Sequence, residues 1–137
     1  MANALYTKGK EKLLQGVFDL ENDTIQVSLV DQGVYTPNLS TDDFRADIPN
    51  NAIIDTQTLA NTSVTDGVFD ADDVTYPTVP SSANTIEYVV LWKDTGDNGT
   101  SPLLALIDTA SGLPTTPNDG DIILVWDNTT NKIFKLT

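Results

Sequence analysis

The alternation of apolar and polar residues along the chain predicts a protein built mainly from β-strands. In residues 24–31, TIQVSLVD, the side chains of Ile25, Val27 and Leu29 fall on one side and polar side chains on the other. A period of two residues is typical of a strand with one buried face. Two more segments with alternating character follow at residues 53–64 and 68–79. We therefore expect each of these segments to form a half-buried strand.

Three later segments are apolar on both faces, at residues 86–94, 103–109 and 121–127. Strands without a polar face are typical of the centre of a sandwich or barrel. A last short strand is expected at residues 132–137. The intervening residues NTTN favour a turn, so we expect the last two segments to pair as a hairpin.

Residues 5–15, LYTKGKEKLLQ, predict a short helix or an ordered arm. Thr7 is placed to cap its start and Gly16 to end it. Gly9 weakens the prediction because glycine is a poor helix former.

A second helical turn is expected in residues 40–49, STDDFRADIP. Ser40 with Asp43 three residues later is a variant of the capping box, and Pro49 prevents continuation beyond one or two turns.

The fold class expected from these elements is mainly β. We predict an antiparallel β-sandwich or small barrel with one or two short N-terminal helices. The chain has 137 residues, which suits one domain with its own core. We expect residues 1–20 to form an N-terminal arm or short helix and residues 21–137 a single β-rich domain. No apolar run is long enough to span a membrane, and no secretory signal is expected.

The net charge of -13 narrows the range of partners. An acidic surface repels nucleic acid and anionic membranes, so we expect neither as a partner. Three of the seven cations, however, lie close together as Lys8, Lys10 and Lys12. With Leu5 and Tyr6 they form a candidate protein interface that could dock on an acidic neighbour, including another copy of this chain. The alternative is that these lysines lie on the solvated face of a short helix.

The chain contains no histidine and no cysteine, which argues against catalysis. The usual general base and the thiol nucleophile are both missing, and no nucleotide-binding motif is present. We therefore expect no enzyme and no cofactor.

The stretch GVFDADDVTY raises the question of whether Asp70, Asp72 and Asp73 form a catalytic pair or a calcium site. We interpret these residues as solvated strand or turn positions and expect no bound metal. Residues 94–99, DTGDNG, come close to a calcium loop, but Gly96 occupies the third ligand position.

The two tryptophans, Trp92 and Trp126, lie in strongly apolar segments. Large aromatic side chains dominate β-protein cores, so we expect both to be buried. The alternative is an exposed platform for sugar binding.

Nearly the whole chain resembles a largely uncharacterised family of small tailed-bacteriophage proteins. The resemblance rests on LYTKGKEKLLQG, TIQVSLVD, YTPNLSTDDFRADIP, VTDGVFDADDVTY and the long segment from WKDTGDNGTSP to DNTTNKIFKL. It implies a structural virion protein and supplies no catalytic residues.

A capsid decoration or cement protein is the first expectation that follows from this resemblance. Such a protein would be made in the bacterial host cytoplasm and would bind the outer capsid surface. Its partners would be the major capsid protein, other copies of itself, or both, with a trimer as one arrangement. A tail or neck component and a glycan-binding host-adhesion module are the alternatives.

Overall fold

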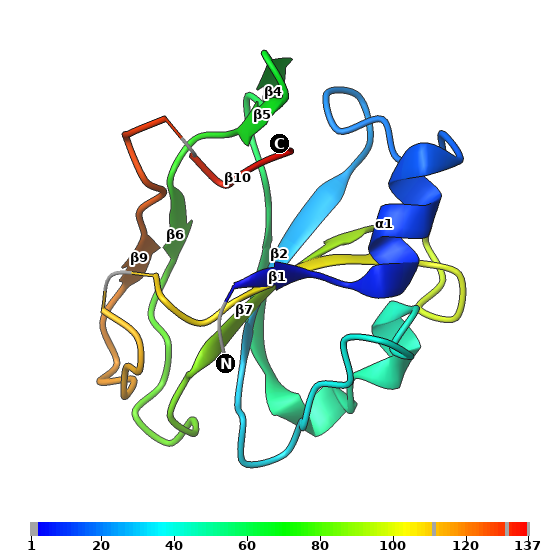
Figure 1. Cartoon of the computed structure of the whole chain (residues 1–137). Coiled ribbons are helices and arrows are strands. Elements are labelled where there is room, and N and C mark those ends of the chain that lie inside the picture. Colours follow the sequence, from blue (N-terminus) through cyan, green and yellow to red (C-terminus); the bar gives the residue numbers. More distant parts are fainter. Residues whose placement is uncertain (1–2, 111, 131, 137) are drawn as a thin grey trace.

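A five-stranded antiparallel sheet with strand order β1-β8-β7-β2-β3 forms the centre of the molecule (Figure 1). Its strands are β1 (Ala4–Leu5), β2 (Ile25–Val30), β3 (Ile53–Thr58), β7 (Tyr88–Lys93) and β8 (Leu103–Ile107). The computed structural model describes residues 3–110, 112–130 and 132–136. The predicted mainly-β fold is confirmed, and β2, β7 and β8 lie where the hydrophobic pattern placed strands.

Two small sheets pack against one face of the central sheet in a sandwich-like arrangement. One has the order β10-β5-β4, and the other pairs β6 with β9. Their strands are β4 (Ser63–Thr65), β5 (Val68–Asp70), β6 (Val74–Tyr76), β9 (Ile122–Leu124) and β10 (Phe134–Lys135). The larger core cluster joins Val27 and Leu91 of the central sheet to Phe69, Leu124 and other residues of this layer. Burial of this apolar surface is the main force that holds the layers together.

The other face of the central sheet is covered by residues 31–52, which contain the 3₁₀ turns η1 (Arg45–Asp47) and η2 (Asn50–Ala52). This cover makes β2 buried on both faces, so the predicted half-buried strand is wrong in that respect. Ser28, expected on the polar side, is fully buried. Its hydroxyl accepts a hydrogen bond from the indole N–H of Trp92 at 2.9 Å and lies 2.7 Å from the hydroxyl of Thr56.

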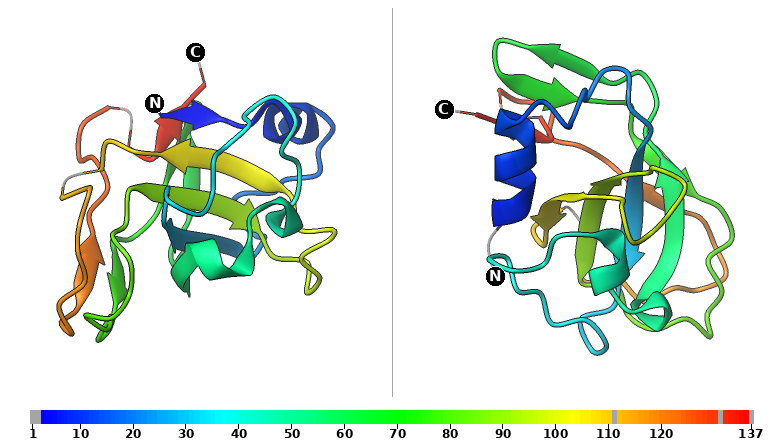
Figure 2. Two further views of the ribbon diagram at one scale, coloured as in Figure 1. Left: turned by 90° about the horizontal axis from the view of Figure 1, so that it is seen from below. Right: turned by 90° about the vertical axis from the view of Figure 1, so that its right-hand side faces the viewer.

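The helix predicted near the N-terminus is α1 (Thr7–Leu14), and it lies along the sheet edge formed by β1 and β8 (Figure 2). Thr7 is not its cap, because Tyr6 occupies the N-cap position without a side-chain bond. Gly16 ends the helix as predicted, with φ of +75°. Gly9 is required by packing, since a Cβ there would lie 2.7 Å from the carbonyl oxygen of Leu103.

The N-terminal segment is an integral part of the domain. β1 pairs with β8 in antiparallel register, and the side chain of Tyr6 is fully buried. The backbone N–H of Tyr6 donates to the carbonyl of Leu104 at 3.0 Å. Residues 4–14 therefore do not project from the body as a free arm.

The predicted helical turn at residues 40–49 forms later than expected. Ser40 does not cap it, because the first helical residue is Arg45. η1 ends at Asp47 with Ile48 as its C-cap, and Pro49, which follows, is the N-cap of η2. Asp47 is the last residue of η1, and its carboxylate accepts hydrogen bonds from the backbone N–H groups of Asp43 and Phe44. These bonds stabilise the start of the turn.

Several strand predictions from residue 53 onward are wrong in detail. The segments at residues 53–64 and 68–79 each divide into two strands, β3 with β4 and β5 with β6. The expected hairpin between residues 121–127 and 132–137 does not form, because β9 pairs with β6 and β10 pairs with β5. Of residues 121–127, only Ile122–Leu124 form a strand, and it lies in a two-stranded sheet and not at the centre of a larger one.

Candidate functional site

The five residues expected to form a protein interface do not act as one surface. Tyr6 is in the core, where its hydroxyl lies 2.9 Å from that of Tyr35. Lys12 forms an ion pair with Asp43 and lies over the ring of Phe44, 4.9 Å from its centroid. These contacts bind α1 to the segment that covers the central sheet. Tyr6 and Lys12 therefore have structural roles within the chain.

The remaining members of that group lie closer to the surface. Leu5 is half-buried in β1, and Lys8 is half-buried with its ammonium 3.6 Å from Glu11. Lys10 is exposed on the outer side of α1. An ion pair within one helix and open to solvent, such as Lys8–Glu11, contributes only about 0.3–0.5 kcal/mol.

The exposed side of α1 carries apolar residues that sequence reasoning missed. Leu14 is 91% exposed and Val17, just beyond the helix, is 38% exposed. Leu14 lies one helical turn beyond Lys10, so both side chains project from the same side. We define Lys10, Leu14 and Val17 as the α1 surface. It is a small basic and apolar area on a strongly acidic molecule.

The aspartates of GVFDADDVTY organise the connection between β5 and β6. Asp72 and Asp73 are exposed, as expected of solvated positions, and Asp70 is half-buried. The carboxylate of Asp73 accepts the backbone N–H of Trp126 at 2.9 Å, and the carboxylate of Asp72 accepts the side-chain amide of Asn61. In the part of the chain that the structure describes, no three acidic side chains are grouped so that they could hold a metal ion.

The loop at residues 94–99 is shaped by hydrogen bonds from its own backbone to its aspartates. The carboxylate of Asp94 accepts the N–H of Gly96, and that of Asp97 accepts the N–H of Gly99, both at 2.8 Å. These are turn-forming bonds that aspartate makes with the backbone two residues ahead.

Both tryptophans are buried, as predicted for core residues. Trp92 and Trp126 are 6% and 5% exposed. The guanidinium of Arg45 lies over the ring of Trp92, 5.8 Å from its centroid. The indole N–H of Trp126 donates to the carbonyl of Asp72 at 3.0 Å. Neither ring therefore offers an open face to a ligand.

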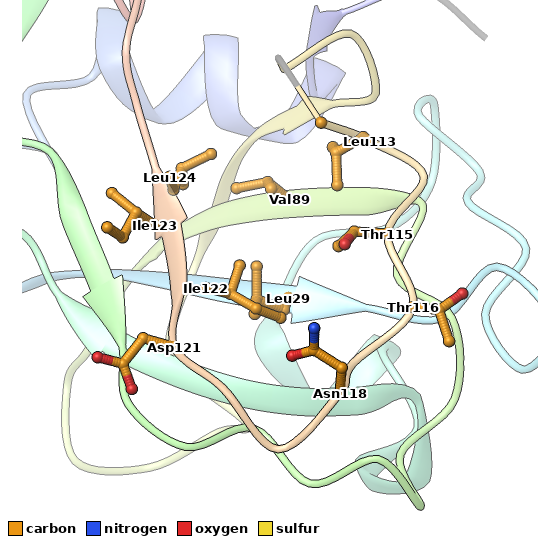
Figure 3. A pocket seen from close by; sticks show the side chains of 11 residues that line it. Leu29, Val89, Leu113, Thr115, Thr116, Asn118, Asp121, Ile122, Ile123 and Leu124 are labelled. Atoms are coloured by element: carbon orange, nitrogen blue, oxygen red, sulfur yellow. The ribbon is translucent and has the colours of Figure 1, made fainter.

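A pocket of about 240 Å³ lies between β9 and residues 113–118 (Figure 3). Ile122 and Leu124 point into it and Ile123 points away. Its floor is formed by Leu29 and Val89 of the central sheet. Polar groups at its rim are engaged elsewhere. The carboxylate of Asp121 accepts the N–H of Thr78, and the side-chain oxygen of Asn118 accepts the N–H of Gly120.

The pocket is lined mainly by apolar and neutral polar side chains. Asp121 is its only acidic lining residue among those the structure describes.

No protein-family model matches the chain, and no curated protein sequence matches it significantly. Within the described residues, α1 and the 3₁₀ turns are all far too short and polar to cross a lipid bilayer.

Proposed function

We propose that this chain is a structural protein of a tailed double-stranded DNA bacteriophage. We further propose that it is a capsid decoration protein, which binds the outer surface of the shell through protein–protein contacts. The resemblance described above supplies the phage context. The contact residues are proposed here from exposure and charge.

The observation that carries this proposal is the exposure of large apolar side chains on a highly charged surface. Leu14, Ile123 and Leu136 are all more than half exposed, and Val125 is 46% exposed. Single exposed apolar residues are ordinary, but adjacent pairs such as Ile123 with Val125 favour a contact surface. Binding to another subunit would remove this apolar area from water.

The charge of the molecule supports a position outside the shell. Packaged DNA repels a chain with a net charge of -13, so a position facing the genome is unfavourable. Among the seven cations, several are already used within the chain. Lys12 pairs with Asp43, Lys93 pairs with Asp23 at 3.2 Å, and Arg45 is buried.

The α1 surface is the part of the chain that we propose to contact the shell. Its basic residue suits an acidic or polar partner, and Leu14 supplies an apolar anchor. An exposed leucine that becomes buried at an interface contributes about 1.5–3 kcal/mol. This surface replaces the interface expected from the sequence, of which it retains Lys10.

The test is the copy number of the chain in purified particles of the phage that encodes it. Quantitative mass spectrometry should give a number equal to, or a simple fraction of, that of the major capsid protein. A few copies per particle would instead indicate a neck or tail component. Absence from washed particles would refute the structural role altogether.

A matched pair of variants tests the α1 surface. Leu14→Ser should lower the occupancy of particles by about tenfold, because most of the apolar anchor is lost. Gln15→Ser alters the neighbouring exposed residue and should leave occupancy unchanged. Equal occupancy for both variants would show that α1 is not the contact.

A further inference from the structure

One edge of β9 is unpaired, and inward and outward side chains alternate regularly along residues 121–127. Along residues 121–127, Ile122, Leu124 and Trp126 are inward and at least partly buried. The outward series is Asp121, Ile123, Val125 and Asp127. Two apolar side chains, 60% and 46% exposed, are therefore flanked on both sides by aspartates.

The backbone of β9 is paired on one side only. β9 is hydrogen-bonded to β6, with Leu124 opposite Val74 and Ile122 opposite Tyr76. Beyond the strand, the N–H of Trp126 also points toward β6, since it donates to Asp73.

Successive residues of a strand direct their backbone groups to opposite sides. The N–H and C=O groups of Ile123 and Val125 therefore point away from β6. Among the described residues, no strand pairs with β9 on that side.

The pocket of Figure 3 provides space beside this edge. It separates residues 121–124 from residues 113–118, which face β9 across the pocket (Figure 3). The facing segment contains Pro114 and Pro117, which have no N–H to offer, while Thr115 bonds to Ile86 through both backbone groups. The facing segment thus does not complete the ladder.

We propose that the free edge of β9 binds an extended segment of another protein, and that this segment carries Lys or Arg beside apolar residues. The segment adds a strand next to β9 through the backbone groups of Ile123 and Val125. Its outward apolar side chains lie beside these two residues, and its basic side chains lie beside Asp121 and Asp127. This inference depends on the proposed function in one respect only, namely which protein supplies the segment.

Charge favours a basic occupant and opposes pairing with a second copy of this chain. If two β9 edges paired in the antiparallel register centred on Leu124, which aligns their apolar residues, Asp121 of one copy would lie opposite Asp127 of the other. Like charges directly opposite in a sheet are destabilising. Opposite charges at the same positions are favourable, so the flanking aspartates select a basic partner and reject self-pairing.

The proposal is tested by titrating the purified chain, labelled with ¹⁵N, with the peptide Lys-Thr-Val-Thr-Val-Thr-Lys. Backbone amide resonances of Ile123 and Val125 should shift, and the affinity should fall as salt is added. Two control peptides replace both lysines by glutamate, or the first valine by proline; in antiparallel register this valine lies opposite Val125 and donates its N–H to it. Each should bind about tenfold more weakly, through charge repulsion or the loss of a backbone donor.

Variants of the chain separate backbone pairing from side-chain contact. Ile123→Pro removes an N–H that faces the free edge and leaves the β6–β9 bonds in place, so binding should weaken about tenfold. Ile123→Val should bind within about twofold of the wild type. Asp121→Asn combined with Asp127→Asn should weaken binding and flatten its salt dependence. If the proline variant does not fold, this double variant tests whether the peptide binds beside β9.

Three results would overturn the proposal: no shift with the lysine peptide, equal shifts with either control peptide, or shifts confined to other strands. The titration uses the isolated chain, so its failure leaves the copy-number experiment on particles unaffected. Conversely, a chain absent from particles could still bind the peptide at β9.

Discussion

Replacing Gly9 by alanine should destabilise the protein, although the same change stabilises an ordinary helix by about 1 kcal/mol. Gly9 is buried in α1 against the backbone of β8. An added Cβ would lie 2.7 Å from the carbonyl oxygen of Leu103 and 3.0 Å from that of Leu104. Both are backbone atoms of a strand held by its neighbours, so the helix and not the sheet must move.

The magnitude follows from what that movement disturbs. Ordinary contact begins at 3.4 Å, so α1 must retreat by about 0.7 Å. Overpacking of this kind costs about 1–3 kcal/mol. The movement also strains the hydrogen bond from the N–H of Tyr6 to Leu104, with a net worth of about 1 kcal/mol. After the gain in helix propensity, the expected net loss is about 1–3 kcal/mol.

Urea unfolding followed by tryptophan fluorescence measures this loss, since Trp92 and Trp126 are both buried. Lys10→Ala in the same helix is exposed and should change stability by no more than about 0.5 kcal/mol. Gly16→Ala is the second control. It meets no neighbouring atom but occupies a left-handed conformation, so it isolates backbone strain of about 1–2 kcal/mol. A stabilised Gly9→Ala variant with an unchanged m-value would refute the close contact between α1 and β8.

Three further predictions concern the cover of the sheet, alkaline pH and the aspartates. Arg45→Ala should lower the free energy of unfolding in urea by about 2–4 kcal/mol. The reason is that the guanidinium packs on Trp92 and donates to the carbonyl of Ile48 at 2.9 Å. A decrease below about 0.5 kcal/mol would show that these contacts do not stabilise the fold. Burial raises the pKa of Tyr6, Tyr35 and Tyr76 above the ordinary value of 10.0. The stability that these neutral hydroxyls give the folded state is therefore complete below pH 10. At higher pH the free energy of unfolding should fall by about 1.4 kcal/mol per pH unit for each tyrosine. Tyr6→Phe should reduce that slope by one tyrosine's share, and an unchanged slope in pH-dependent denaturation would contradict the assignment. Asp73→Ala should cost about 1 kcal/mol through the lost bond to the N–H of Trp126, whereas Asp70→Asn should be nearly neutral in the same assay; equal losses would show that Asp73 has no special structural role.

The parts of the fold that the sequence predicted are those set by local patterning. β7 and β8 are apolar on both faces in the sequence and buried on both faces in the structure. α1 ends at the glycine expected to end it. In these segments the local preference and the tertiary environment agree, so the pattern is sufficient.

The incorrect predictions concern features that depend on distant parts of the chain. Ser28 has the polar identity of a solvent-facing residue, but its hydroxyl pairs with Trp92 once residues 31–52 cover that face. The sequence of this covering segment has no periodic pattern that predicts it, because its two helical turns contain only three residues each. One missed feature did have a local signal. Asp66-Gly67, both with positive φ, forms the tight turn between β4 and β5, and Asp-Gly is a preferred pair for such turns.

The candidate site was the least predictable feature because exposure is a tertiary property. The lysines near the N-terminus suggested an interface, yet Lys12 is engaged by Asp43 from a segment far along the chain. Conversely, Leu14 has the identity of a core residue, and only the position of α1 on the sheet leaves it exposed.

Residues 121–127 contain the strand edge that we propose to bind a partner. Its composition led to the prediction of a strand buried on both faces, yet only its inward residues are buried within the chain. Isoleucine and valine on the outward face leave apolar area open to water and increase the tendency to aggregate. The flanking aspartates reduce that risk by opposing self-pairing. Apolar residues for contact and acidic residues for selectivity are the combination expected of an edge that is completed by a basic strand from another subunit.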